Sequence, residues 1–359
     1  MGMGASTTPI QPAMQLFIDT DMGVDDAVAV AWLLAQPTLD IVGISTVYGN
    51  TSVEAVTSNV LTLLDAANRD IPVTIGAANP LVCKPYLVGP LLHGPDGFWG
   101  FQAPHDLSDL PRDAPAAIAA AARANPNLVI LALGPMTNLA QAIQAYPDDL
   151  ANVRVIAVAG SRNGGNTTPV AEFNAYADPH ALDILLSSNM RIELVMRDAF
   201  EQLTIDAPAF IERLGASGNS VGQLLSRMLV PYAQMSAFGG GGVAIPDAVA
   251  AIYALRPDLG SPRSALVQVM TVEGYVRGQT IVADTLSTRM SLILTADEMS
   301  ELAQQFVKPG FDLQAAIGSV LQRRLDNAQV LLEVNAAEML RLLEETLIQT
   351  TDKVREVGG

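Results

Sequence analysis

Four aspartates lie within eight residues near the start of the chain, in Asp19-Thr20-Asp21-Met22-Gly23-Val24-Asp25-Asp26. Carboxylates this close repel one another unless a bound cation or raised pKa values relieve the repulsion. Their hard oxygen atoms are the ligands that Ca²⁺ and Mg²⁺ prefer. Asp25 and Asp26 could instead cap the following helix and favour its dipole, but capping explains only one or two of the carboxylates. The segment therefore predicts a site for a divalent cation.

The apolar pattern around the aspartates predicts how they are positioned. Leu16-Phe17-Ile18 is typical of a short buried strand, and residues 25–35 of a helix, so the aspartates lie where a strand ends and a helix begins. In open α/β sheets, ligands bind at this edge. Further strands are expected at 41–47, 72–75, 128–133, 153–159 and 192–196, and further helices at 52–67, 114–124, 139–146 and 179–188.

This alternation predicts an α/β fold, a mainly parallel doubly wound sheet flanked by helices on both faces. After Asp206 the pattern becomes mostly helical, which indicates extra C-terminal helices. We expect one domain over residues 14–359, with a helical insertion at about 294–328. Residues 1–13 are expected to be disordered or vector-derived. Later strands are expected at 266–272, 280–283 and 331–334, and later helices at 221–237, from 247, within 296–325 and at 337–347.

Polar side chains follow other predicted strands at the same edge of the sheet. The strand at 128–133 runs into Gly134-Pro135-Met136-Thr137-Asn138, a turn that can direct a backbone carbonyl such as that of Thr137 toward a metal. Each of these residues alone is at least as well explained as a turn or cap residue. Together they suit a polyhydroxylated ligand, which needs several hydrogen-bond donors and acceptors. The side chains are those of Asn50, Asn166, Glu172, Asn174 and Asp247.

Composition excludes several other classes of protein. The 359 residues include 20 basic and 37 acidic ones, a net charge of −17, which argues against nucleic acid or an anionic membrane as partner. No apolar run approaches the roughly 18 residues of a membrane span. The single cysteine, Cys83, excludes an intramolecular disulfide and a cysteine-rich zinc site. Without the pattern of a signal peptide, we expect a cytoplasmic protein.

Motifs for other chemistries are missing. The four glycines at 239–242 are not followed by the Lys-Ser/Thr of a phosphate-binding loop, and there is no Gly-x-Ser-x-Gly. No cluster of arginine or lysine supplies a phosphate site, which disfavours phosphorolysis. His93, in His93-Gly94-Pro95-Asp96-Gly97, is as readily a loop-packing residue as a catalytic one.

Taken in order, these segments resemble the inosine-uridine preferring nucleoside hydrolases. The match runs from about Leu16 to Asp284 and returns more weakly from Val330. The aspartate cluster followed by Glu172-Phe173-Asn174 is its most specific part. The other matching segments are Thr46-Val47-Tyr48-Gly49-Asn50, Ile71-Pro72-Val73, His93-Gly94-Pro95-Asp96-Gly97, Ala132-Leu133-Gly134-Pro135-Met136-Thr137-Asn138-Leu139 and Arg277-Gly278-Gln279-Thr280.

The resemblance implies a Ca²⁺-dependent enzyme that hydrolyses the N-glycosidic bond of ribonucleosides to base and ribose, with a role in purine or pyrimidine salvage. It implies that Asp21 deprotonates a Ca²⁺-bound water that attacks C1′. It also implies a homodimer or homotetramer. The implied Ca²⁺ ligands are Asp21, Asp26, the Thr137 carbonyl and Asp247. The implied ribose ligands are Asp25, Asn50, Asn166, Glu172 and Asn174.

The chain departs from the family pattern at two positions. Members commonly have histidine just before the last metal-binding aspartate, where this chain has Pro246, and proline cannot protonate a departing base. His93 is then the remaining imidazole on a matching segment, and stacking on Trp99 or Tyr232 is another route to activate the base. Met22 stands where many members have proline or asparagine, and it does not add the ribose contact that asparagine would.

Three interpretations follow from these departures. The first is a hydrolase of ordinary ribonucleosides. The second is a protein that binds ribosyl compounds with little turnover, although the intact Asp21 argues against a pure binder. The third is a hydrolase of another N-ribosyl compound such as nicotinamide riboside, whose cationic base leaves without protonation. Variable loops build the base pocket, so the choice between purine and pyrimidine stays open.

Overall fold

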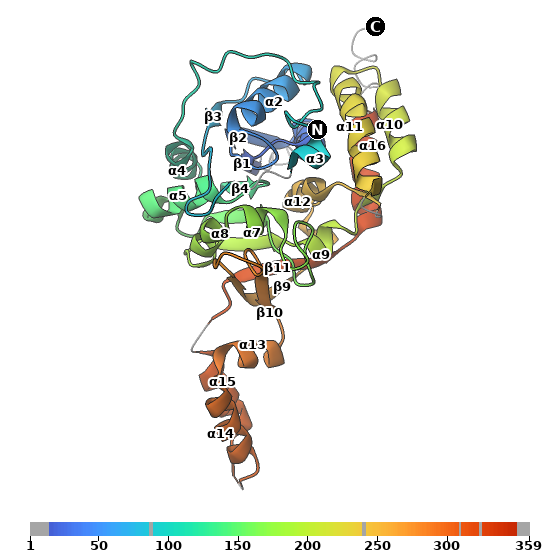
Figure 1. Cartoon of the computed structure of the whole chain (residues 1–359). Helices are drawn as coiled ribbons and strands as arrows, with labels where there is room; N and C mark the ends of the chain where they lie inside the picture. Colours follow the sequence, from blue (N-terminus) through green and yellow to red (C-terminus); the bar gives the residue numbers. More distant parts are fainter. Residues whose placement is uncertain (1–13, 86–88, 239–241, 309, 323–324, 350–359) are drawn as a thin grey trace, which may run out of the picture.

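A nine-stranded sheet lies at the centre of the computed structural model, which describes residues 14–85, 89–238, 242–308, 310–322 and 325–349 (Figure 1). The expectation for residues 1–13 lies outside these ranges. The strand order is β10-β9-β11-β6-β5-β4-β1-β2-β3. Neighbours from β3 to β11 are parallel, whereas β9 and β10 extend one edge in antiparallel pairing. The predicted mainly parallel α/β sheet is therefore confirmed.

The strands are short and mostly buried, as their continuous apolar runs predict. A separate antiparallel pair joins β7 and β8. The strands are β1 (Met14–Thr20), β2 (Leu39–Thr46), β3 (Val73–Ile75), β4 (Val129–Ala132), β5 (Arg154–Val158), β6 (Arg191–Val195), β7 (Thr204–Ile205), β8 (Val243–Ala244), β9 (Gly260–Val269), β10 (Thr280–Ala283) and β11 (Ala328–Val334).

Side chains of the central strands alternate between two hydrophobic cores, one on each face of the sheet. Leu16 and Ile18 of β1 belong to one core and Phe17 to the other. This is the period of two that a strand imposes. Because β1 pairs with β2 on one side and β4 on the other, the aspartates that follow it emerge from the end of an interior strand of the sheet.

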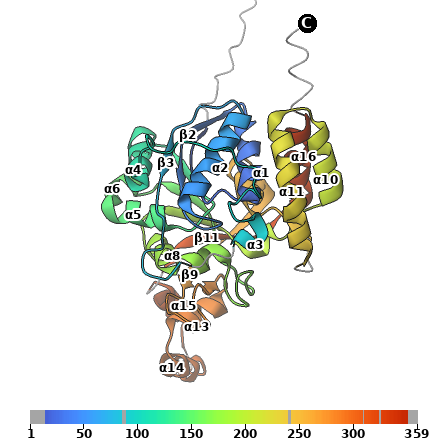
Figure 2. The ribbon, with the colours of Figure 1, turned by 45° about the horizontal axis from the view of Figure 1, so that its top comes forward.

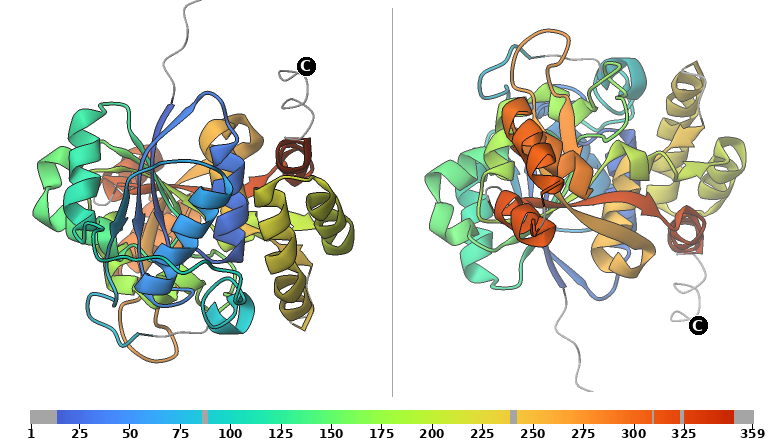
Figure 3. Two further views of the ribbon diagram at one scale, coloured as in Figure 1. Left: turned by 90° about the horizontal axis from the view of Figure 1, so that it is seen from above. Right: turned by 90° about the horizontal axis from the view of Figure 1, so that it is seen from below.

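Helices cover both faces, as Figure 3 shows from above and below. One face carries α1 (Val24–Leu34), α2 (Val53–Ala66), α9 (Arg197–Phe200) and α12 (Pro246–Leu255), with α10 (Ala207–Ala216), α11 (Ser220–Phe238) and α16 (Ala336–Gln349) packed beyond them. The other face carries α4 (Ala114–Ala124), α5 (Thr137–Ala145) and α8 (Pro179–Leu186). The remaining short elements are α3 (Gly89–His93), α6 (Pro147–Leu150), α7 (Phe173–Ala177) and the 3₁₀ turn η1 (Pro257–Leu259).

Three helices project from the β9–β10 edge, away from the rest of the chain (Figures 1 and 2). They are α13 (Leu286–Ile293), α14 (Ala296–Phe306) and α15 (Leu313–Leu321). The segment expected as a helical insertion at 294–328 contains the last two, and helix begins earlier, at Leu286. Within the described ranges, no helix has the length and apolar character needed to cross a bilayer.

Asn138, at the start of α5, ties together the ends of several strands. Its side-chain nitrogen donates to Asp19 Oδ1 at 2.7 Å and to the Thr46 carbonyl at 2.9 Å, and its oxygen accepts from the Ala77 amide at 2.8 Å. Asp19 is itself buried, and its Oδ2 has no hydrogen-bond partner. This network holds β1 in place directly before the aspartate cluster.

We expect Asn138→Ala to lower the free energy of unfolding by about 2–4 kcal/mol, because several buried polar groups lose their partners. Urea unfolding followed by circular dichroism measures this change. Gln144→Ala, an exposed position on the same helix, serves as the matched control and should stay within about 0.5 kcal/mol of the unsubstituted protein. Equal stability of the two variants would contradict the role given to Asn138.

Candidate active site

The turn between β1 and α1 holds Asp26 in a fixed position. Its Oδ1 accepts from the Thr20 hydroxyl at 2.6 Å, and its Oδ2 accepts from the Gly23 amide at 2.9 Å and from Asn50 Nδ2 at 3.2 Å. A side chain at Gly23 would place its Cβ 2.6 Å from His93 Nδ1, so the turn needs glycine there. The capping role considered for Asp26 is therefore confirmed, since its side chain accepts from the amide of Gly23, the N-cap residue of α1.

Asp21 lies at the same edge of the sheet, and the loop after the neighbouring strand β2 holds its carboxylate in place. Its Oδ2 accepts from the backbone amide of Asn50 at 2.9 Å, in the loop that follows β2. A Cβ at Gly49 would overlap this carboxylate, so glycine permits the close approach of the loop. Asp21 is 2 % exposed, yet it lines a cavity.

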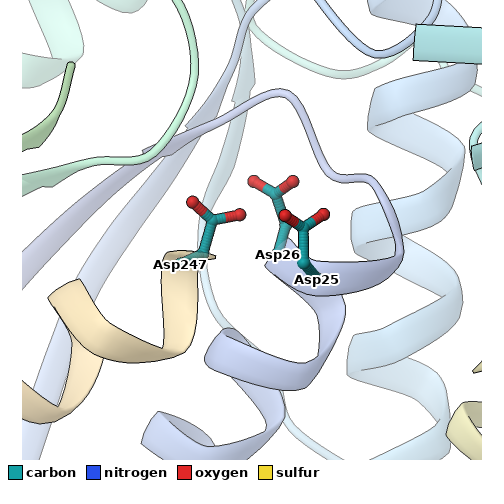
Figure 4. A group of neighbouring side chains, drawn as sticks. All are labelled: Asp25, Asp26 and Asp247. Atoms are coloured by element: carbon teal, nitrogen blue, oxygen red, sulfur yellow. The ribbon is translucent and has the colours of Figure 1, made fainter. Parts of the chain in front are cut away.

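Asp25, Asp26 and Asp247 form a group that could hold a cation (Figure 4). Each offers a carboxylate oxygen, and these oxygens lie within 4.8 Å of one another. Asp25 and Asp26 come from the start of α1, and Asp247 from the first turn of α12. Asp25 Oδ1 is buried and has no hydrogen-bond partner. A group of three buried carboxylates, one of which has an oxygen without a partner, fits a hard divalent cation.

The raised pKa values of these carboxylates also support a cation site. Burial raises the pKa of Asp25 and that of Asp26 to about 6. Burial, followed by repulsion from neighbouring aspartates, raises the pKa of Asp21 and Asp247 well above the ordinary range. A divalent cation among them would relieve both penalties.

A cavity of about 390 Å³ opens above the aspartates. Among the described residues, all charged side chains that line it are acidic, and its polar and apolar residues come from both loops and helices. The acidic members are Asp21, Asp25, Asp26, Glu172 and Asp247; the other polar ones are Asn50, His93, Asn166, Thr167 and Asn174; the remainder are Gly89, Leu91, Leu92, Leu133, Val158, Phe173, Phe200, Tyr232 and Pro246.

Glu172 and Asn174 line the cavity from the start of α7. The Glu172 carboxylate accepts from the amides of Asn174 and Ala175 and from that of Gly160 at 2.8 Å, and burial raises its pKa to about 7. Asn174 Nδ2 donates to the carbonyls of Leu133 and Val158, which leaves its buried Oδ1 without a partner. Asn174 therefore offers a free acceptor, while exposed Asn166 lies on the adjoining loop.

His93 and Tyr232 meet on another side of the cavity. Their ring centroids are 5.5 Å apart. His93 Nδ1 accepts from the Val24 amide at 3.1 Å and lies 3.6 Å from Asp25 Oδ1, and burial lowers its pKa to about 4. The Tyr232 hydroxyl donates to the Ala244 carbonyl at 3.0 Å. His93 therefore faces the site as a neutral ring, with Nδ1 already engaged as an acceptor.

Two of the predicted site residues do not line the cavity. The Trp99 indole N–H donates to the Leu92 carbonyl at 3.1 Å, and the ring packs against the core beneath α3. The prediction that Trp99 stacks on the base is thus not supported by its position. Thr137 is fully buried and its hydroxyl donates to Asp178 at 2.8 Å, and its carbonyl as a metal ligand stays a prediction.

The structure adds contributors that the sequence did not indicate. Thr20 supports Asp26 from within the aspartate segment itself. Phe200, on α9, brings an aromatic ring to the cavity from a short helix without a recognisable motif. Leu91 and Leu92 lie directly before His93 and could have been expected from that proximity.

Comparisons with known proteins agree with this fold and site. The chain matches the family model "inosine-uridine preferring nucleoside hydrolase" over residues 16–341. It is 36% identical over 273 residues to the non-specific ribonucleoside hydrolase RihC of Salmonella typhimurium, covering 75% of this chain and 88% of that protein. The chain belongs to the inosine-uridine preferring nucleoside hydrolase family. It is therefore an enzyme, a hydrolase of N-glycosyl compounds, and its family is metal-dependent.

Solved structures show the same architecture. A plant nucleoside hydrolase, PpNRh1, has a TM-score of 0.77 and 27% identity, covering 94% of this chain and 99% of its own. A purine-preferring ribonucleoside hydrolase from Gardnerella vaginalis, at 22% identity, shares the fold, with a TM-score of 0.76 over 93% of this chain and 98% of its own.

Proposed function

We propose that the enzyme is a Ca²⁺-dependent hydrolase that cleaves the N-glycosidic bond of ribonucleosides. The observation that carries this proposal is the cavity in which Asp21, Asn174 and the group Asp25, Asp26 and Asp247 converge. The donor set is all oxygen, which suits Ca²⁺ better than zinc or copper. The non-specific ribonucleoside hydrolases among the relatives agree with this substrate class.

Asp21 is the proposed general base. Bound Ca²⁺ would lower the pKa of a water molecule that it holds. Asp21 lines the cavity beside the three aspartates of the cation group, and the Asn50 amide fixes one of its oxygens. The side chain therefore takes the proton as the water attacks C1′.

The remaining polar residues hold the ribose. Asn174 Oδ1 is a buried acceptor without a partner, and a sugar hydroxyl would supply the missing donor. Asn50 and Glu172 line the same cavity and add amide and carboxylate oxygens. The carboxylates of the cavity also stabilise the positive charge that develops on the ribose as the N-glycosidic bond breaks. We also propose that the enzyme forms a homodimer or homotetramer and acts in the cytoplasm.

A reducing-sugar assay tests the proposal, with inosine, adenosine, guanosine, uridine and cytidine as substrates. We expect the Ca²⁺-loaded enzyme to release ribose from at least one of them. The rate should fall at least 100-fold after chelation and dialysis, and it should return when Ca²⁺ is restored. Activity that survives metal removal would contradict the Ca²⁺ dependence. Ribose binding measured by calorimetry, without turnover of any riboside, would favour a binding protein instead.

A further inference from the structure

We infer that the preferred substrates carry a cationic base, as in N-ribosylpyridinium compounds or N7-alkylated purine ribosides. This inference rests on the proposed hydrolase function and adds the chemical class of the leaving group. It comes from two observations about the cavity. One is the sign of its charges, and the other is the set of groups that could give a proton to the departing base.

The charges of the cavity all have one sign. Five carboxylates line it, and no lysine or arginine does so within the described residues. One divalent cation does not neutralise so many carboxylates, and the protein as a whole carries −17. A concave acidic site concentrates its field and favours a positively charged ligand. The aromatic rings of Phe173, Phe200 and Tyr232 are also cavity residues, and such rings attract a cationic heterocycle.

The side chains next to the acidic group offer no proton for the base. Pro246 lines the cavity directly before Asp247 and has neither a side-chain donor nor a backbone N–H. The Tyr232 hydroxyl already donates to the Ala244 carbonyl. Both carboxylate oxygens of Glu172 accept backbone amides. None of these groups is arranged as a general acid.

His93 is not arranged as a general acid either. A backbone amide can only donate, so the hydrogen bond from Val24 requires that Nδ1 carries no proton. The ring then keeps one N–H, at Nε2, which can donate a hydrogen bond but gives up its proton far less readily than an imidazolium. His93 thus positions a ligand rather than protonating it.

A cationic base removes the need for a proton. Water forms its bond to C1′ and loses a proton to Asp21, while the C1′–N bond breaks and its electron pair returns to the ring nitrogen. A pyridinium leaves as a neutral pyridine, so the charges balance without an acid. A hypoxanthine or uracil would leave as an anion and would need a proton. Supplying that proton is worth about 10²–10⁴-fold in rate.

Nicotinamide riboside and its reduced 1,4-dihydro form provide the sharpest comparison, because they have nearly the same shape and differ in ring charge. We expect kcat/KM for the cationic form to exceed that for the neutral form and that for inosine by at least 100-fold at pH 7. Raising the ionic strength should lower kcat/KM for the cation and leave the neutral substrates nearly unchanged.

Pro246→His tests the missing acid directly, with Pro246→Ala as the control for loss of the proline ring. The histidine variant is expected to raise the inosine-to-nicotinamide-riboside ratio of kcat/KM at least tenfold over the alanine variant. Circular dichroism checks that both variants fold. Inosine or uridine cleaved as fast as nicotinamide riboside by the unsubstituted enzyme would overturn this inference and leave the proposed function intact. Release of ribose from neither class would overturn the proposed function itself.

Discussion

Asp21→Asn is expected to lower kcat by about 10³-fold, because the substitution removes the group that accepts the proton from the attacking water. The asparagine keeps the size of the side chain and one acceptor oxygen for the Asn50 amide. KM for the best riboside should change by less than about tenfold, since the ribose-binding residues stay in place. Ribose release under steady-state conditions measures both constants.

Two controls separate loss of the base from other effects. Asp148→Asn removes an exposed carboxyl of α6 that lies outside the cavity, and it should keep full activity. Titration with Ca²⁺ then distinguishes the two roles given to Asp21. If Asp21 acts only as a metal ligand, excess Ca²⁺ restores kcat. If it acts as the base, kcat stays low at saturating metal. Recovery of more than a tenth of the activity would contradict the assignment as base.

Asp247→Asn is expected to change stability in opposite directions with and without Ca²⁺. In the metal-free protein, burial and then repulsion from Asp26, Asp25 and Asp21 disfavour the charged form of this carboxyl, so the neutral asparagine should raise the free energy of unfolding. In the loaded protein it removes a metal ligand. Ca²⁺ at about 1,000 times its Kd stabilises a protein by about 4 kcal/mol, and the variant should lose most of that at the same concentration. Thermal unfolding with and without Ca²⁺ measures both effects.

The pH dependence of the metal-free protein provides an independent check. Burial raises the pKa of Asp19, Asp25 and Asp26 from 3.8 to about 6, so the folded state binds protons that the unfolded chain has released between these values. The contribution of these carboxyls to the free energy of unfolding therefore falls as the pH rises from about 4 through 6. We expect Tm to decrease from pH 5 to pH 7 without metal and this slope to shrink with saturating Ca²⁺. A Tm that responds equally to pH in both states would contradict the assigned cation group.

The sequence predicted the central strands and the helices between them well, because strands buried on both faces are continuous apolar runs. Edges were harder. β9 begins at Gly260 rather than near Leu266. Its first residues are mostly polar and exposed, and they pair with β11 alone, because β10 pairs only with residues 266–269. The helix α13 was not predicted separately, because it buries none of its residues and so shows little amphipathic pattern.

The grouping of the aspartates and their position in the fold could be predicted from the sequence alone. The carboxylates of Asp21, Asp25 and Asp26 lie within one strand-to-helix turn, so their proximity follows from covalent connection. Their position at the carboxyl edge follows from the alternation of strands and helices. The same residues carried the resemblance to the nucleoside hydrolases, which the comparisons confirm. The class of enzyme and its acidic site were thus determined before any coordinates.

Only the tertiary structure decided which distant residues complete the site. Asp247 was implied as a metal ligand by the resemblance alone, and it reaches the aspartates because α12 packs directly on α1, a contact that no sequence period encodes. Packing of α3 against α11 brings His93 against Tyr232, and His93 also accepts from the Val24 amide. Trp99 follows closely on His93, yet it packs partly buried against the core and donates to the Leu92 carbonyl. Side-chain direction at a loop is set by the partners that satisfy its polar atoms, and these partners come from remote parts of the chain.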